Sequence, residues 1–283
     1  MLKFLSLSSG SSGNCYFLSN ESRGLLIDAG VSLRRLKRGL GEYGFGEYGF
    51  GLDAFQAVLV THDHLDHIRH LGSYCKRLRV PVFTTRTLQE ALLRHTFTRD
   101  CMASCRHDLD EAGETRIFRE LGCDGGDGPS VHCFVVPHDA TQTVGYAIHW
   151  EGRRFVLMTD MGRMTEEALE YGRSADTVVI ESNYDMGMLI GGPYTHELKM
   201  RICQGNGHLS NEECARAIRE FWHPGLRNLF LCHLSDNNNT PALACESAAA
   251  ALRSIRTEDG GTAEERTRFE PLPRGRASRL FDL

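Results

Sequence analysis

The sequence predicts an α/β protein in which β-sheets are covered by helices. Short apolar runs typical of strands occur along the whole chain, and beyond its first part they alternate with segments of helical periodicity. Of the 283 residues, 41% are hydrophobic and 24% are charged, which is the composition of an ordinary globular protein. No long linker divides the chain, so we expect one domain spanning residues 1–283.

The first expected elements are strands at residues 16–19 and 24–28 and a helix at 32–40, for which Ser32 is a suitable N-cap. A tandem repeat of GEYGF follows, and its glycines predict a loop insertion over residues 41–51. The repeat either extends a loop without catalytic purpose or forms a mobile flap beside a site.

The remaining strands are short apolar runs, and the helices between them show apolar residues at helical spacing. We expect strands at 54–60, 80–85, 131–137, 145–150, 153–160, 175–182 and 227–233, with 145–150 and 153–160 forming a hairpin. We expect helices at 85–95, 165–171, 194–202, 210–221 and 241–252. The polar tail predicts an exposed loop at 253–267 before a final strand near 268–272.

The densest group of metal-capable side chains is the stretch VTHDHLDHIRHLG, which directly follows a predicted strand. Side chains two residues apart in an extended segment point to the same side, so His62, His64 and Asp66 point together. His67 follows at once, whereas we expect His70 to lie outside the ligand set. Imidazole and carboxylate groups suit zinc, manganese or iron rather than calcium. A solvated loop would not need histidine at each of these positions.

Three later strands each end in a residue that can bind a metal. His138 follows CFVVP, Asp160 ends FVLMTD and His233 ends NLFLCH. A lone histidine after a strand is usually a polar residue at a sheet edge. Three such endings, after the histidine-rich stretch, indicate the second half of a metal site.

The motif HxHxDH, followed in order by His138, Asp160 and His233, resembles the pattern of the metallo-β-lactamase-fold hydrolase superfamily. Asp28, which ends GLLID, matches the supporting aspartate that precedes the motif in that family. The resemblance implies an αββα four-layer sandwich, in which two mixed sheets lie face to face. It also implies two divalent ions, which can be zinc, manganese or iron, and a metal-bridged hydroxide as the nucleophile. The matching positions assign two ligand sets and one bridging carboxylate: His62, His64 and His138; Asp66, His67 and His233; and Asp160.

Further segments resemble the YycJ-like branch of this superfamily, which processes DNA as 5′-to-3′ exonucleases: SSGSSGNCYFL, VPHDA, ESNYDMGML, GHLSN and CHLSDNNNTP. The resemblance extends over residues 2–252 and implies a nucleic-acid substrate, for which we expect DNA, with RNA as the alternative. Tyr184 departs from this branch, where histidine is expected, and the GEYGF repeat has no counterpart there.

The residues around the predicted metal site favour a phosphoryl substrate. Ser210 and Glu213 have the spacing of a capping box, and His208 lies just before them, so backbone N–H groups and an imidazole converge where an anion would bind. The candidates for substrate binding are Ser11, Ser12, Asn14, Asn183, His208, Ser210, Asn211, Ser235, Asn237 and Asn238. As catalytic residues we expect Asp66, which would orient the nucleophile, and His208, which would hold a terminal phosphate or protonate the leaving 3′ oxygen.

The main alternative is a glyoxalase-II-like thioesterase or another small-ester hydrolase, which would use the same ligands with a closed substrate pocket. A diiron oxidoreductase would need a flavin domain, which is not visible in the sequence. A secreted β-lactamase would need an export signal. A metal-binding module without activity usually lacks some of the ligands that are present here.

The net charge of −5 argues against a protein that coats nucleic acid by electrostatics alone. The five arginines at 265–280 would either follow a DNA backbone or form a solvated, salt-bridged surface. Among the ten cysteines, Cys101 and Cys105 give a weak zinc signal, and the other interpretation is reduced thiols. Since no export signal or apolar run of membrane-spanning length is present, we expect a cytoplasmic protein without a membrane partner.

Overall fold

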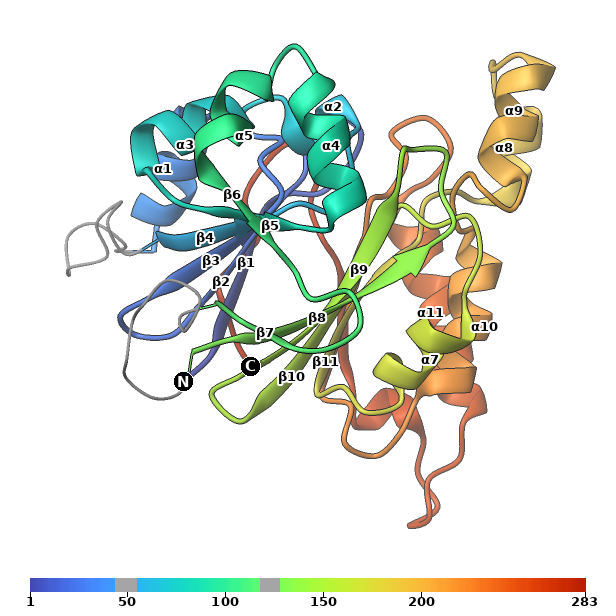
Figure 1. Cartoon of the computed structure of the whole chain (residues 1–283). Helices are drawn as coiled ribbons and strands as arrows, with labels where there is room; N and C mark the ends of the chain where they lie inside the picture. The colour runs from blue at the N-terminus through green and yellow to red at the C-terminus, as the bar shows by residue number, and fades with distance from the viewer. Residues whose placement is uncertain (44–54, 118–127) are drawn as a thin grey trace.

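Two mixed seven-stranded sheets lie face to face in the computed structural model, which describes residues 1–43, 55–117 and 128–283 (Figure 1). The first sheet has the order β14-β1-β2-β3-β4-β5-β6, and the second has the order β13-β12-β11-β10-β9-β8-β7. The first consists of β1 (Lys3–Ser8), β2 (Cys15–Ser19), β3 (Gly24–Ile27), β4 (Phe55–Leu59), β5 (Val82–Thr84), β6 (Arg106–Asp108) and β14 (Phe281–Asp282). The second consists of β7 (Thr115–Arg116), β8 (Ser130–Val136), β9 (Thr143–Trp150), β10 (Arg153–Met158), β11 (Thr177–Glu181), β12 (Asn228–Cys232) and β13 (Arg268–Pro271).

Helices cover the outer face of each sheet, which confirms the predicted αββα arrangement (Figure 1). The first sheet is covered by α1 (Leu33–Gly41), α2 (Leu65–Ile68), α3 (Leu71–Leu78), α4 (Arg86–Arg94) and α5 (Arg99–Cys105). The second sheet is covered by α7 (Glu166–Gly172), α10 (Asn211–Phe221) and α11 (Pro241–Ser254). The short helices α8 (Met186–Gly191) and α9 (His196–Cys203) project from the second half of the molecule.

The central core lies between the two sheets, and its aromatic side chains come from both of them. The Phe4 ring of β1 lies 5.2 Å from the ring of Phe155 on β10 and 5.2 Å from that of Phe230 on β12. All three side chains are fully buried. Two further apolar clusters fill the space between each sheet and its helices. The sheets are therefore joined by burial of apolar surface, which gains about 25 cal/mol for each Å² removed from water.

Local sequence signals fix several element boundaries as expected. Thr85, Thr165 and Ser210 each accept a hydrogen bond from the backbone N–H three residues further on, so α4, α7 and α10 begin there. Glu151 and Gly152 both have positive φ, which closes the predicted β9–β10 hairpin with a tight turn.

The segment around α8 and α9 differs from the sequence prediction. The helix predicted at 194–202 begins at His196, because Thr195 caps it by accepting from the N–H of Leu198. Helix α8 was not predicted, since two glycines in MGMLIG weaken the helical pattern. It begins here because the Asp185 side chain caps it by accepting from the N–H of Met188.

The chain ends also differ from the prediction. Strand β1 was not predicted, because serines alternate with its leucines, yet five of its six residues are buried. The exposed loop predicted at 253–267 is wrong in part: it begins inside α11 and contains a 3-10 helix, Ala263–Glu265, whose Ala263 is fully buried. Strand β13 occurs where predicted but is not the last strand, because β14 follows and pairs with β1 in the other sheet.

Two predictions stay open. Of the insertion at 41–51, Gly41 ends α1, and residues 44–51 lie outside the described residues. The extent of a single domain over 1–283 also stays a prediction.

Among the described helices, none combines the length and apolar character that a bilayer span requires.

We expect Phe4→Ala to lower the free energy of unfolding by about 3–5 kcal/mol, because it opens a cavity between the sheets. Chemical denaturation would measure the loss. The control is Phe97→Ala, because the side chain of Phe97 is 57% exposed and its removal should change stability little. Equal effects of the two substitutions would contradict this role of Phe4.

Candidate metal centre

The predicted ligands converge where strands of both sheets end. Asp28 follows β3, Asp160 lies two residues after β10, and His233 follows β12. All three have positive φ, of 64°, 53° and 52°, in a region that residues other than glycine seldom adopt. Such backbone strain persists where surrounding contacts enforce it, and it is common at functional sites.

The first group consists of His62, His64 and His138. One ring nitrogen of each lies within 4.8 Å of the others. His138 Nδ1–H donates to the Gly207 carbonyl at 2.8 Å, which leaves Nε2 directed into the group, 3.3 Å from His64 Nδ1. His62 Nδ1 lies 3.0 Å from the Thr61 hydroxyl, so its Nε2 is likewise available. These three nitrogens can bind one cation.

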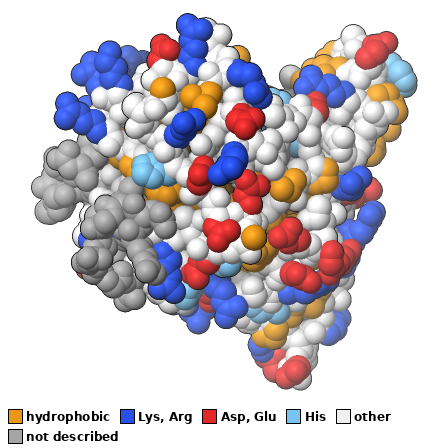
Figure 2. Space-filling view, viewed as in Figure 1, with side chains coloured by type: hydrophobic (Ala, Val, Ile, Leu, Met, Phe, Trp, Pro, Cys, Tyr) orange, Lys and Arg blue, Asp and Glu red, His pale blue; other side chains and the backbone are white. Residues whose placement is uncertain are grey.

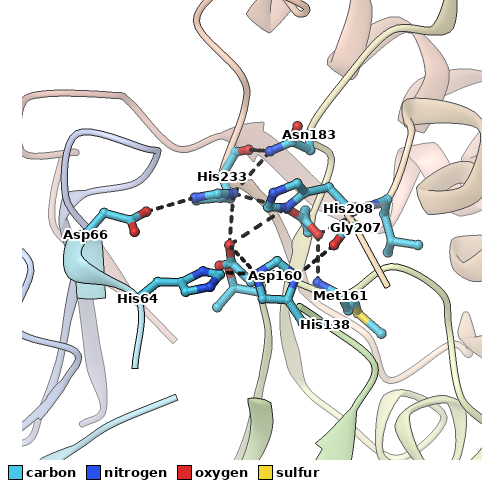
Figure 3. A network of polar contacts seen from close by, with 12 residues as sticks. His64, Asp66, His138, Asp160, Met161, Asn183, Gly207, His208 and His233 are labelled. Atoms are coloured by element: carbon cyan, nitrogen blue, oxygen red, sulfur yellow. Dashed lines mark hydrogen bonds and ion pairs between the residues drawn. The ribbon is translucent and has the colours of Figure 1, made fainter. Parts of the chain in front are cut away.

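The second group consists of Asp66, His67 and His233, again within 4.8 Å. An Asp66 oxygen lies 3.6 Å from His67 Nε2 and 3.5 Å from His233 Nε2. Asp160 extends between the two groups: its oxygens lie 3.3 Å from His67 Nε2 and 3.9 Å from His138 Nε2. Figure 3 shows Asp66 directed toward His233, and Asp160 toward His233 and His138. The structure thus brings all seven predicted ligands together.

Two buried nitrogens show that these residues fit a metal. His62 Nε2 and His233 Nε2 are buried and have no hydrogen-bond partner among the described residues. A buried polar atom without a partner costs about 1–3 kcal/mol, so such atoms need an explanation. Coordination of a divalent cation supplies one, because neutral imidazole and carboxylate groups are its usual ligands.

Residues behind the ligands hold their orientation. His67 Nδ1–H donates to Asp28 at 2.7 Å, which directs Nε2 toward Asp66 and Asp160. The Thr61 N–H donates to the same Asp28 carboxylate at 2.8 Å. His70, by contrast, is the residue directly before α3 and belongs to none of the candidate ligand groups.

Sequence reasoning missed Glu181, a fully buried carboxylate at the end of β11. It accepts from His208 Nδ1–H at 2.7 Å and from the Met161 N–H at 2.9 Å, and it lies 3.1 Å from His233 Nδ1. The signal was present, because Glu181 ends an apolar strand in the same way as Asp160 and His233.

The carboxylates of the site attract positive charge. Burial opposes the charged imidazoles, yet Asp28 raises the pKa of His67 and Asp160 raises that of His233 to about 10. Burial opposes ionisation of Asp160, but His233 and His67 hold the pKa of its carboxyl well below its usual range. Burial also opposes the charged form of His208, yet Glu181 raises the pKa of its imidazole. Burial lowers the pKa of His62 and of His138, which keeps both imidazoles neutral and able to bind metal.

A cavity of about 350 Å³ opens beside these groups. Of the predicted substrate-binding residues, it is lined by Ser11, Asn183, His208 and Ser235. It is also lined by Arg201, which sequence reasoning missed.

The other predicted substrate-binding residues lie elsewhere. Ser12 is exposed, and Asn237 donates to the Tyr194 hydroxyl at 2.7 Å. Asn14 lies 2.8 Å from His67 Nε2, and Ser210 caps α10. Asn211 and Asn238 are buried, and neither lines the cavity. Tyr184, which stands where histidine was expected, is also buried, and its backbone forms an isolated parallel β-bridge with that of Ser210.

Known proteins share these features. The family model for the β-lactamase superfamily domain matches residues 23–233, which include every predicted metal ligand. Exodeoxyribonuclease WalJ of Streptococcus pneumoniae serotype 2 (strain D39 / NCTC 7466) is 31% identical over 242 residues, covering 86% of this chain and 85% of the relative. Exodeoxyribonuclease YycJ of Bacillus anthracis is 30% identical over 251 residues, covering 89% of each chain. The metallo-β-lactamase fold protein YhfI from Bacillus subtilis has a TM-score of 0.66 at 14% identity, covering both chains fully.

We expect Asp28→Asn to weaken metal binding about 10–100-fold, because His67 would lose the charged acceptor that orients its ring. Titration of metal-free protein with Mn²⁺ in a calorimeter measures this. Asp63→Asn is the matched control, since Asp63 lies within the same motif but accepts from the Thr141 N–H and belongs to none of the candidate ligand groups. Unchanged affinity in Asp28→Asn would contradict the assignment.

Proposed function

We propose that this chain, which belongs to the metallo-β-lactamase superfamily, is a metal-dependent 5′-to-3′ exonuclease that acts on DNA. One observation carries the proposal: two relatives named as exodeoxyribonucleases match over at least 85% of both chains. The predicted metal ligands, which lie together in candidate groups, support it. The word exodeoxyribonuclease in both names favours DNA over RNA as the substrate of this chain.

The proposed cofactors are two divalent ions, zinc or manganese, with iron as a third candidate. His62, His64 and His138 would hold one ion, and Asp66, His67 and His233 would hold the other, with Asp160 shared between them. Such a pair of cations activates water and neutralises the charge that develops on phosphate oxygens.

The chain's own residues then position the reactants. Asp66 reaches the edge of the cavity, where its carboxylate would orient the attacking nucleophile. His208 donates its Nδ1–H to Glu181, and this contact favours the protonated ring, so Nε2 retains a proton for the substrate. We propose that His208 holds a terminal phosphate or protonates the leaving 3′ oxygen.

The cavity lining is suited to a phosphodiester. Ser11, Asn183 and Ser235 place hydroxyl and amide groups on its wall, and the Arg201 guanidinium, which pairs with Asp139 there, adds further donors. We propose that Ser12 and Asn237 contact the strand further out. Asn14, Ser210, Asn211 and Asn238 would act through their neighbours, by holding the metal ligands and the loops in place.

Several arginines of the tail at 265–280 already have partners, so we propose only a small role for the tail in DNA binding. Arg274 and Arg279 each pair with a carboxylate, of Asp236 and Glu270 respectively, and Arg268 donates to the Asp282 carbonyl. This pattern favours the salt-bridged surface over a free DNA-binding segment. Removal of the tail would also delete β14, so point substitutions are the better test.

The decisive experiment supplies metal-stripped protein with Mn²⁺ or Zn²⁺ and offers labelled DNA or RNA that bears a 5′-phosphate or a 5′-hydroxyl. We expect stepwise shortening of DNA from its 5′ end. A small thioester serves as a control for the glyoxalase-II-like alternative. Thioester turnover without nuclease activity would overturn the proposal.

We expect His208→Ala to slow DNA cleavage about 10²–10⁴-fold, the contribution typical of a general acid, and to reduce the preference for 5′-phosphorylated ends. Single-turnover rates on the two DNA ends would measure both effects. His196→Ala is the control, because His196 is exposed on α9 and does not line the metal-centre cavity. If rate and preference are both unchanged in His208→Ala, the role assigned to His208 is wrong.

A further inference from the structure

Three cysteines converge on the opposite side of the first sheet from the central core. Cys75 lies on α3, and Cys101 and Cys105 lie on α5, one helical turn apart. Their sulfur atoms lie within 4.8 Å of one another. The sequence pattern indicated only Cys101 and Cys105 as neighbours, so the position of Cys75 beside them is a finding of the structure.

The packing of the two helices explains this convergence. Residues four apart on a helix share a face, so Cys101 and Cys105 both point toward α3. Gly72, at the start of α3, permits the close approach: a Cβ there would lie 3.0 Å from the Phe97 carbonyl oxygen and 4.0 Å from Cys101 Sγ. A larger residue at Gly72 would push the two helices apart.

The three thiols border a cavity of about 720 Å³ on the surface of the protein. Cys75 is buried, whereas Cys101 and Cys105 are half-buried, so an ion could enter from solvent. Lys76, Arg79 and His107 line the same cavity. Figure 2 shows that Lys and Arg side chains gather over this helical side of the molecule. Hydrogen bonds with Cys105 and Cys75 lower the pKa of the Cys101 thiol, so one sulfur of the cluster favours the thiolate, which is the form that binds metal.

We propose that Cys75, Cys101 and Cys105 form a second metal site, which binds a thiophilic cation such as Zn²⁺ separately from the metal centre. Tetrahedral zinc with Zn–S bonds of about 2.3 Å places its sulfur ligands roughly 3.8 Å apart, a separation that the present spacing accommodates with small side-chain shifts. His107 lines the cavity but does not belong to the group of ligand atoms, so water would complete the coordination at the fourth position.

Three thiols in one place favour a metal over a disulfide. A disulfide joins two sulfurs and leaves the third unpaired, whereas a tetrahedral ion uses all three. Each thiol that binds loses its proton to solvent, and no oxidant is required. The ion would link α3 to α5, and because α3 starts directly after the HxHxDH motif, it would stabilise the support of the metal centre rather than take part in its chemistry.

Cobalt distinguishes this site from the metal centre, because only thiolate ligands give an intense sulfur-to-cobalt charge-transfer absorption in the near ultraviolet. Reduced full-length protein is titrated with Co²⁺ and then with Zn²⁺. We expect the absorption to develop in the wild-type protein and to disappear when Zn²⁺ displaces cobalt. We expect Cys101→Ser and Cys105→Ser to abolish it and to lower zinc content by one equivalent.

The matched control is Cys245→Ser, a half-buried cysteine on α11, which should keep the absorption and the zinc content. Thiol counting on the wild-type protein gives a second readout that needs no variant: bound Zn²⁺ should protect the two half-buried thiols, Cys101 and Cys105, from a thiol-specific reagent. Absence of the charge-transfer band in reduced wild-type protein, or its survival in both Cys101→Ser and Cys105→Ser, would overturn the proposal. A disulfide among the three cysteines that reforms in place of zinc binding would overturn it as well.

Discussion

The buried carboxylate of Asp28 is the group on which the metal centre depends. A charge without exposure to water costs several kcal/mol unless hydrogen bonds compensate it. Here the compensation comes from the backbone and hydroxyl of Thr61 and from the imidazole of His67. The same bonds join the end of β3 to the end of β4 and aim His67 Nε2 into the site. The same hydrogen bonds of Asp28 therefore stabilise this corner of the fold and orient the His67 ring.

In the second sheet, the buried carboxylate of Glu181 has a similar role. Asp160 and His233 adopt a left-handed backbone conformation at the ends of β10 and β12, which costs on the order of 1–3 kcal/mol for each residue. Glu181 compensates by accepting from the N–H of Met161, next to Asp160, and by contacting His233 Nδ1. The strain is held in place by the strands and by this carboxylate, and it directs the ligands across the space between the sheets.

These physical features explain which parts of the site could be predicted from the sequence. His138, Asp160 and His233 each follow an apolar strand, so their positions could be inferred without knowing the topology. The substrate-binding residues could not be sorted in this way, because they lie in loops and at the first residues of helices. Asn211 and Ser235 both belong to short polar segments, yet Asn211 donates inward to Asn239 and Ser235 lines the cavity. Nothing in such a segment states on which side a short polar side chain will point.

Contacts between distant segments set the same limit for the fold. The pairing of β1 with β14 joins the two ends of the chain, and neither strand has a strong local pattern of its own. The thiol cluster depends in the same way on the packing of α3 against α5, which a spacing rule for cysteines does not capture.

The two sites also differ in ligand chemistry, since imidazole and carboxylate accept zinc, manganese or iron while thiolates select softer cations. The two proposed sites would therefore be kept apart by ligand type, even when both draw on the same pool of ions.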